Sequence, residues 1–219
     1  LSAPGSSGYS APKLRIWRSG NHSTFPCRAH VAFSTIRKDA PIDFPFVMAR
    51  LAGLASQVRP GPGAHALMRP RVDIGAQTAP RPEQWRPAAG LVLVFPDAAA
   101  APGGNIASVV LTVRSSSLDR RGGQVSLPGG VIEPGETAER AALREASEEI
   151  GVSEAGLRML GTLTPVDIAV SGFRLTPVVA ASPVAPRFRA SDGEVERVVV
   201  LPLGRSEEHT SELQSRFGI

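Results

Sequence analysis

Carboxylates gather in one short stretch of this chain. Residues 129–152, GGVIEPGETAERAALREASEEIGV, place Glu145, Glu148 and Glu149 within five positions, with Glu136 upstream. At helical spacing the three neighbouring carboxylates point the same way and repel one another unless a cation neutralises them. Mg²⁺ takes oxygen ligands and usually retains substrate phosphates in its shell. The pattern indicates either a carboxylate-bound metal facing a phosphate ester or anhydride, or an acidic helix face in solvent.

The element that positions these carboxylates is predicted to be an amphipathic helix over residues 137–150. Thr137 can cap its N-terminus, and Gly151 follows as the stop. Arg144 precedes Glu148 by four residues, so the two side chains can pair. The opposite face carries small or apolar residues that can lie close to a sheet, namely Ala138, Ala141, Ala142, Ala146 and Ile150.

The spacing of these residues resembles the Nudix box. That pattern runs Gly, five residues, Glu, seven residues, then Arg-Glu, an aliphatic residue, any residue, Glu-Glu, any residue, Gly and an aliphatic residue. Gly130, Glu136 and residues 144–152 follow it, and Ala146 is smaller than the usual aliphatic residue. The resemblance implies that Gly130 lets the loop approach the helix and that Glu136 ties the loop to it.

The same resemblance implies a fold and an activity. The fold would be the α/β Nudix fold, a mixed β-sheet sandwiched between helices. The reaction would be hydrolysis of a nucleoside diphosphate linked to another group, with water attacking phosphorus and Mg²⁺ or Mn²⁺ neutralising the developing charge. Glu145 and Glu149 would be metal ligands with Glu148 close by, and Arg144 would orient the carboxylates.

Residues 111–130, LTVRSSSLDRRGGQVSLPGG, resemble the signature of coenzyme A diphosphatases within this family. Asp119 stands where that signature has a basic residue, and two arginines follow it directly. Residues 86–94, 164–180 and 193–203 are similar to the same subfamily. The agreeing positions are Leu111, Thr112, Arg114, Ser115, Gly123, Gln124, Leu127, Pro128, Gly129 and Gly130.

This second resemblance implies that coenzyme A is the substrate and that 3′,5′-ADP and 4′-phosphopantetheine are the products. The 3′-phosphate of coenzyme A calls for extra cations, and arginine supplies planar multi-donor contacts to phosphate. Two alternatives remain open: a Nudix hydrolase of ADP-ribose or a dinucleotide, and a truncated non-catalytic fragment. The implied substrate-binding residues are Arg114, Ser115, Arg120, Arg121, Gly129 and Gly130, although each arginine could equally be a solvated surface residue.

Further candidate residues stand alone in the sequence. Asp167 and Glu194 are the downstream carboxylates best placed for a general base or an extra metal ligand, and Glu194 is the preferred catalytic candidate. Either could instead end a strand in solvent. His65 lacks any ligand spacing, which favours a surface histidine.

The rest of the middle region predicts a mixed α/β domain. Apolar runs indicate strands at residues 89–95, 107–115, 157–163, 173–181 and 195–201, and residues 48–58 have the spacing of a short helix. Residues 59–87 are rich in proline and glycine and are expected to be an extended lead-in. Loops are expected at residues 97–105 and 116–130. Strands on both sides of one helix favour a single mixed domain over residues 48–204.

The two ends differ from this middle. Residues 1–47 hold both lysines, the only tyrosine and the only cysteine, Cys27. They are interpreted either as a disordered extension or as non-native sequence upstream of a genuine start at Met48. Residues 205–215, RSEEHTSELQS, resemble a translated sequencing adapter, so residues 205–219 are interpreted as a non-native tail after which a C-terminal helix would be missing. The alternative is a natural polar helix over residues 206–214.

Composition limits the function classes. Hydrophobic residues make up 42%, enough for a packed core. The net charge is +4, but residues 48–204 hold 16 basic and 15 acidic residues. This region therefore lacks the excess of positive charge that nucleic-acid binding requires. No apolar run has the length of a membrane span, and a single cysteine cannot form an internal disulfide. We therefore expect a cytoplasmic protein that binds a small nucleotide; the oligomeric state stays open.

Overall fold

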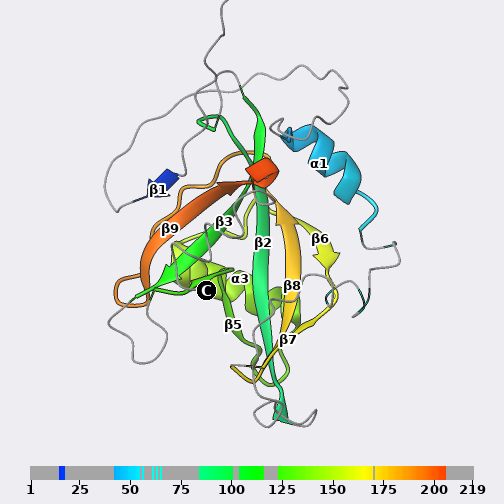
Figure 1. Ribbon diagram of the computed structural model, residues 1–219, viewed down its shortest axis with the longest axis vertical. Coiled ribbons are helices and arrows are strands. Elements are labelled where there is room, and N and C mark those ends of the chain that lie inside the picture. The colour runs from blue at the N-terminus through cyan, green and yellow to red at the C-terminus, as the bar shows by residue number, and fades with distance from the viewer. Residues whose placement is uncertain are drawn as a thin grey trace, which may run out of the picture.

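The fold is a mixed β-sheet with a helix packed on each face (Figure 1). The computed structural model describes residues 15–17, 42–54, 84–100, 104–115, 123–169 and 171–205, with residues 56, 61, 63 and 65. Within this part of the chain no helix is long and apolar enough to cross a membrane. The predicted α/β class, with a mixed sheet between helices, is confirmed.

In the part of the chain that the structure describes, the sheet has nine strands. β2 and β8 are parallel, and the other pairs are antiparallel. The main path runs through β1 (Arg15–Trp17), β9 (Val195–Pro202), β3 (Ile106–Arg114), β2 (Arg86–Asp97), β8 (Phe173–Ala181) and β6 (Arg158–Thr162). Off this path, β4 (Val125–Ser126) pairs with β3, β5 (Gly129–Val131) with β2, and β7 (Val166–Ile168) with β8.

The short strands β4 and β5 lie where β2 and β3 separate. β2 pairs with β3 through residues 94–97 and with β5 through residues 88–90. β4 continues the pairing of β3 at Thr112 and Val113. The segment expected to be a loop, residues 116–130, therefore contributes two strands. Strands of two and three residues are too short to show an alternating hydrophobic pattern, which is why the sequence did not reveal them.

Alternation along β2 divides the core between the two faces of the sheet. Ala89, Leu91, Leu93 and Phe95 lie in the cluster that also contains the apolar face of α3 (Ala138–Ile150). Val92 and Val94 belong to the opposite face, which is partly covered by α1 (Phe44–Leu51). Figure 1 shows α3 behind the sheet and α1 beside its other end. The core thus has two layers of side chains, one on each face.

The N-terminal helix differs from its predicted bounds. It was expected at residues 48–58 and spans Phe44–Leu51. Phe44 and Val47 pack on the sheet, and the Ala107 N–H donates to Ile42 O at 2.8 Å. The predicted boundary between residues 47 and 48 therefore falls inside a helix. Pro45, which fits the first helical turn, and the packing of Phe44 explain the earlier start.

The longer strands lie close to their predictions, and all of them except β6 bury a continuous apolar run. β8 has the predicted bounds, and the other four differ by up to three residues at an end. A 3₁₀ turn, η2 (Leu203–Arg205), follows β9. The predicted lead-in at residues 59–87 lies mostly outside the described residues, as does most of the proposed tail at residues 205–219. The status of both chain ends stays a prediction.

Candidate functional site

The site begins with the helix α3, which is fixed at both ends. The Thr137 side chain accepts a hydrogen bond from the Arg140 N–H at 3.3 Å. Gly151 ends the helix in the left-handed conformation, with φ of 68°. Ala141, Ala142 and Ala146 are buried against the sheet, so the glutamates stand on the other side. The predicted cap, stop and small-residue face are confirmed.

Arg144 joins the loop before α3 to the carboxylates on it. Its Nε and Nη2 donate to the two carboxylate oxygens of Glu136, each at 3.1 Å. Its Nη1 donates to Glu145 Oε1 at 2.9 Å and approaches Glu148 Oε2 at 3.5 Å. Nη2 also donates to the Val131 carbonyl at 3.1 Å. Glu136 thus ties the loop to the helix through Arg144, and Arg144 orients the helix carboxylates.

The charges of this hub hold one another in the ionised state. The Arg144 hydrogen bonds, followed by the Glu133 N–H, lower the pKa of Glu136 below its usual value. In return, hydrogen bonds to Glu136 and Glu145 raise the pKa of Arg144. A guanidinium with a bidentate carboxylate partner has a fixed orientation as well as a fixed charge. The hub is therefore a rigid support for the glutamates beside it.

Two glycines let the strand β5 pass between α3 and β2. The Gly129 N–H donates to Glu149 Oε2 at 3.2 Å. A side chain on Gly130 would collide with the Glu145 carboxylate, and one on Gly129 would collide with the Ala89 carbonyl. The loop can approach the helix this closely only because neither residue has a Cβ.

Glu149 is the carboxylate most affected by its surroundings. Burial, above all, raises its pKa to about 7, and the neighbouring charges of Glu145 and Glu194 add to the shift. The Gly129 N–H and the positive charge of Arg114 oppose it. Burial and two acidic neighbours together outweigh the positive charge of Arg114, and a bound cation would favour the ionised form of Glu149.

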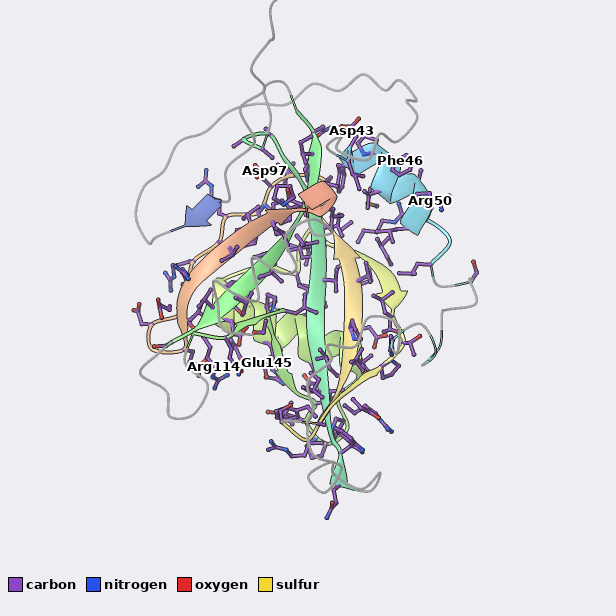
Figure 2. The ribbon with its side chains drawn as sticks, viewed as in Figure 1. Asp43, Phe46, Arg50, Asp97, Arg114 and Glu145 are labelled. Carbon is purple, nitrogen blue, oxygen red and sulfur yellow. The ribbon has the colours of Figure 1, made fainter. Side chains whose placement is uncertain are left out.

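Three segments far apart in the sequence therefore meet at one end of the sheet. Glu149 comes from α3, Arg114 from the end of β3, and Glu194 from the turn before β9. The Ser115 N–H donates to the Glu194 carbonyl at 2.9 Å. Figure 2 shows Arg114 and Glu145 near one another at this end, while Phe46 lies on α1 at the other.

The predicted metal ligands do not form a ready-made cage. Within the described residues, no group of three acidic, histidine or cysteine side chains is arranged to hold a metal ion. Glu145, Glu148 and Glu149 instead face the Arg144 guanidinium and the Gly129 N–H. Their oxygens are nevertheless the ligands that Mg²⁺ and Mn²⁺ prefer, and burial together with the charges of Glu145 and Glu194 raises the pKa of Glu149. The donor set fits a divalent cation.

Other predicted residues lie elsewhere. Arg120 and Arg121 fall outside the described residues. Asp167 receives hydrogen bonds from Arg174 Nε at 2.7 Å and Nη2 at 3.0 Å across the β7–β8 pair, so it acts as an ion-pair partner there. Glu194, the other downstream carboxylate considered, raises the pKa of Glu149 through its charge.

Sequence reasoning missed the backbone groups of the site. The Gly129 N–H and the Val131 carbonyl contact the helix side chains, and the Ser191 N–H donates to the Glu149 carbonyl at 2.8 Å. The paired glycines signal a close approach but not its partner. Residues 186–192 carry no sequence signal that places them at the end of α3.

Comparison with known proteins gives a consistent result. The family model described as NUDIX domain matches residues 84–213. A protein of Escherichia coli K12 named "Uncharacterized Nudix hydrolase NudL" is 40% identical over 99 residues, 45% of this chain and 51% of that protein. The corresponding protein of Citrobacter koseri is 39% identical over 99 residues, with the same coverage. The chain spans about half the length of the curated relatives it matches.

Two solved structures give further similarities. The Nudix hydrolase RenU of M. smegmatis is 27% identical, with a TM-score of 0.45 over 58% of this chain and 74% of that chain. An Ap4A hydrolase of C. elegans is 21% identical, with a TM-score of 0.44 over 61% of this chain and 93% of that chain. The assignment of the chain to a family rests on the NUDIX domain match, which covers more than half of its residues.

Proposed function

This chain belongs to the Nudix family, and from that premise we propose that it hydrolyses the diphosphate bond of coenzyme A, with Mg²⁺ or Mn²⁺ as cofactor. The observation that carries the proposal is that Arg114 lies near enough to Glu149 for its positive charge to act on the pKa of that carboxylate. It joins the residues that resemble the coenzyme A signature to the residues of the Nudix box. One substrate could then contact the metal carboxylates through its diphosphate and Arg114 through another phosphate.

Glu145 and Glu149 are the proposed metal ligands, with Glu148 beside them. A divalent cation would neutralise charge on the diphosphate and lower the pKa of a bound water. Arg144 keeps Glu145 and Glu148 oriented through its bond to Glu136. Because Gly129 and Gly130 have no side chains, the loop leaves room for a diphosphate beside the carboxylates. The N–H of Gly129 donates a hydrogen bond to Glu149.

Glu194 is the proposed proton acceptor. It is exposed and close enough to raise the pKa of Glu149. In the proposed step a water oxygen bonds to phosphorus, and the bond from phosphorus to the bridging oxygen breaks. One water proton passes to a Glu194 carboxylate oxygen, and the bridging oxygen leaves on the second phosphate. The products are 3′,5′-ADP and 4′-phosphopantetheine.

Recognition of the 3′-phosphate separates coenzyme A from other Nudix substrates. Arg114 and Ser115 end β3 beside the site, and Arg120 and Arg121 follow in the sequence. An arginine contact to phosphate strengthens binding through charge-assisted hydrogen bonds. ADP-ribose and dinucleotides such as NADH lack the 3′-phosphate, so these arginines would add little for them.

The test compares coenzyme A with 3′-dephospho-coenzyme A, which has the same diphosphate. The parent chain should prefer coenzyme A by about tenfold or more in kcat/KM, the value of one charge-assisted contact. The variants Arg114→Ala and Arg120→Ala/Arg121→Ala should reduce that preference. Arg50→Ala is the control, because Arg50 is exposed on α1.

Two outcomes decide between the alternatives. Equal kcat/KM values for the two compounds on the parent chain would remove the coenzyme A assignment. Faster cleavage of ADP-ribose or NADH would then identify the other substrate class. No metal-dependent hydrolysis of any of these compounds by the folded chain would favour the non-catalytic alternative. A small nucleotide substrate and the single cysteine also fit the cytoplasmic location that forms part of this proposal.

A further inference from the structure

The connection between β8 and β9, residues 182–194, holds the C-terminal end of α3. We call this segment the β8–β9 loop. The Arg189 N–H donates to the Ile150 carbonyl at 2.9 Å, and the Ser191 N–H donates to the Glu149 carbonyl at 2.8 Å. Carbonyls in the last turn of a helix lack donors from within the helix. The loop supplies them, and so it fixes the turn of α3 that carries Glu149.

The same loop is anchored in the core. Phe188 is 8% exposed and belongs to the cluster that packs α3 on the sheet. Its ring lies 5.4 Å from that of Phe95 on β2, tilted by 59°. Aromatic pairs in this arrangement add to the stability gained from burial alone. The packing of Phe188 therefore anchors the loop in the core, and the residues after Phe188 extend from this anchor toward the site.

At its far end the loop is tied to β3. Val113 pairs with Arg197, but Arg114 pairs with Val195, so the register shifts by one residue and Glu196 is the extra residue on β9. The Ser115 N–H then bonds to the Glu194 carbonyl. A β-bulge changes the direction of side chains near it. Here it brings Glu194 alongside the end of β3 that carries Arg114.

Between these two attachments lies a tight turn. The Val195 N–H reaches the Ser191 carbonyl at 3.4 Å, and Gly193 within the turn has φ of +90°. A Cβ on Gly193 would meet nothing within 4 Å. Substitution by alanine would therefore strain the backbone without causing a collision.

We propose that Gly193 is a positioning residue. Its left-handed backbone allows the turn that connects the end of α3 to the end of β3, and this turn places Glu194 beside Glu149. The inference rests on the proposed function, since it concerns Glu194, the proposed proton acceptor, and its approach to Glu149, a proposed metal ligand. Gly193 itself touches neither substrate nor metal. Its effect passes through Glu194.

The test uses Gly193→Ala with Gly156→Ala as the matched control, in the full chain. Gly156 has φ of +86°, and a Cβ there also meets nothing within 4 Å. It lies in the turn before β6, at the edge of the sheet away from β9. The two substitutions impose the same backbone cost at different places. The readouts are the dissociation constant for Mn²⁺, the melting temperature and the rate of coenzyme A hydrolysis.

Gly193→Ala should weaken Mn²⁺ binding by about tenfold, the usual effect of losing a group that orients metal ligands. Gly156→Ala should lower the melting temperature by a similar amount and leave Mn²⁺ binding unchanged. Glu194→Gln should weaken Mn²⁺ binding at least as much as Gly193→Ala. Adding Gly193→Ala to Glu194→Gln should then have little further effect, as expected for two changes that act through one group.

Equal Mn²⁺ affinities in the two glycine variants would overturn the inference, and so would additive effects in the double variant. Should Gly193→Ala fail to fold, Gly193→Asn and Gly156→Asn provide the same comparison, because asparagine tolerates positive φ better. Failure of the parent chain to bind Mn²⁺ and to hydrolyse any diphosphate would refute the proposed function and this inference together. A parent that does both, with equal variants, refutes the inference alone.

Discussion

The two helices that cover the sheet differ in how their ends are capped and in how deeply they are buried. α3 has a side-chain cap at Thr137, a left-handed glycine after its last turn, and five buried residues. α1 has no side-chain hydrogen bond at its N-cap, Asp43, and no residue of it is buried. Both are amphipathic and both pack on an apolar face of the same sheet.

The difference follows from what each helix carries. α3 presents Glu145, Glu148 and Glu149. Its own Arg144 bonds to Glu145, and β5 and the β8–β9 loop bond to its last turn. The proposed metal site would require carboxylates in a fixed arrangement, and these contacts hold the last turn of α3 in place. α1 only shields Val92, Val94 and their neighbours from water. We infer that changes on α3 alter the reaction, whereas changes on α1 alter stability alone.

The largest expected effect is that of Glu149→Gln on α3. Glutamine can still accept from the Gly129 N–H, so the fold should persist, but the charge that would hold a metal is gone. Metal-dependent hydrolysis should fall by more than about a hundredfold, since groups that only orient metal ligands already cost about tenfold to a hundredfold. The measurement is kcat over a range of Mg²⁺ concentrations, with Arg50→Gln on α1 as control. Normal turnover at low Mg²⁺ would contradict the ligand assignment.

Arg144→Lys should have the next largest effect. Lysine keeps the positive charge but cannot reach Glu136 with two donors while also holding Glu145. We expect kcat to fall about tenfold to a hundredfold, with weaker Mn²⁺ binding. Arg140→Lys is a matched control, because Arg140 makes only a 3.7 Å contact with Glu154 and both side chains are more than 60% exposed. Similar losses of kcat in the two variants would show that the hydrogen bonds of Arg144 do not support the reaction.

Phe44→Ala tests the contribution of α1. Phe44 packs against the two clusters on that face and is half-buried, so its truncation should cost about 1–2 kcal/mol of unfolding free energy, less than for a fully buried phenylalanine. Chemical denaturation measures this cost. The rate of hydrolysis at a temperature well below the melting point should not change. Phe46→Ala, which removes a ring outside the described clusters, should cost less. A large loss of activity in Phe44→Ala would contradict the inference that changes on α1 alter stability alone.

The helix caps give the smallest effect. Thr137→Ala removes the acceptor of the Arg140 N–H and should destabilise the chain by about 1 kcal/mol. Asp43→Ala removes a side chain without such a bond and should change stability by less than about 0.5 kcal/mol. Denaturation curves of both variants test the comparison. An equal loss for both would mean that Asp43 caps α1 in solution.

Features set by neighbouring residues were available from the sequence. The bounds of α3 and its apolar face follow from a cap, a stop and a 3.6-residue period, all of which are local. The long strands follow from continuous apolar runs. The Nudix pattern of Gly130, Glu136 and residues 144–152 is also local. It implied that Glu136 ties the loop to the helix, but not that Arg144 is the residue through which Glu136 does so.

The tertiary structure decided which distant segments meet. Either Glu194 or Asp167 could have stood near the helix carboxylates, and Asp167 instead lies within β7 in an ion pair with Arg174. The difference depends on the β-sheet register, which shifts by one residue after Val113, and on a loop that crosses the end of α3. Alternation along a strand specifies which residues share a face but not their partners on other strands. The sequence by itself therefore determined the acidic helix, and only the packing of β3, β9 and the β8–β9 loop around it brought Arg114 and Glu194 to the same end of the sheet.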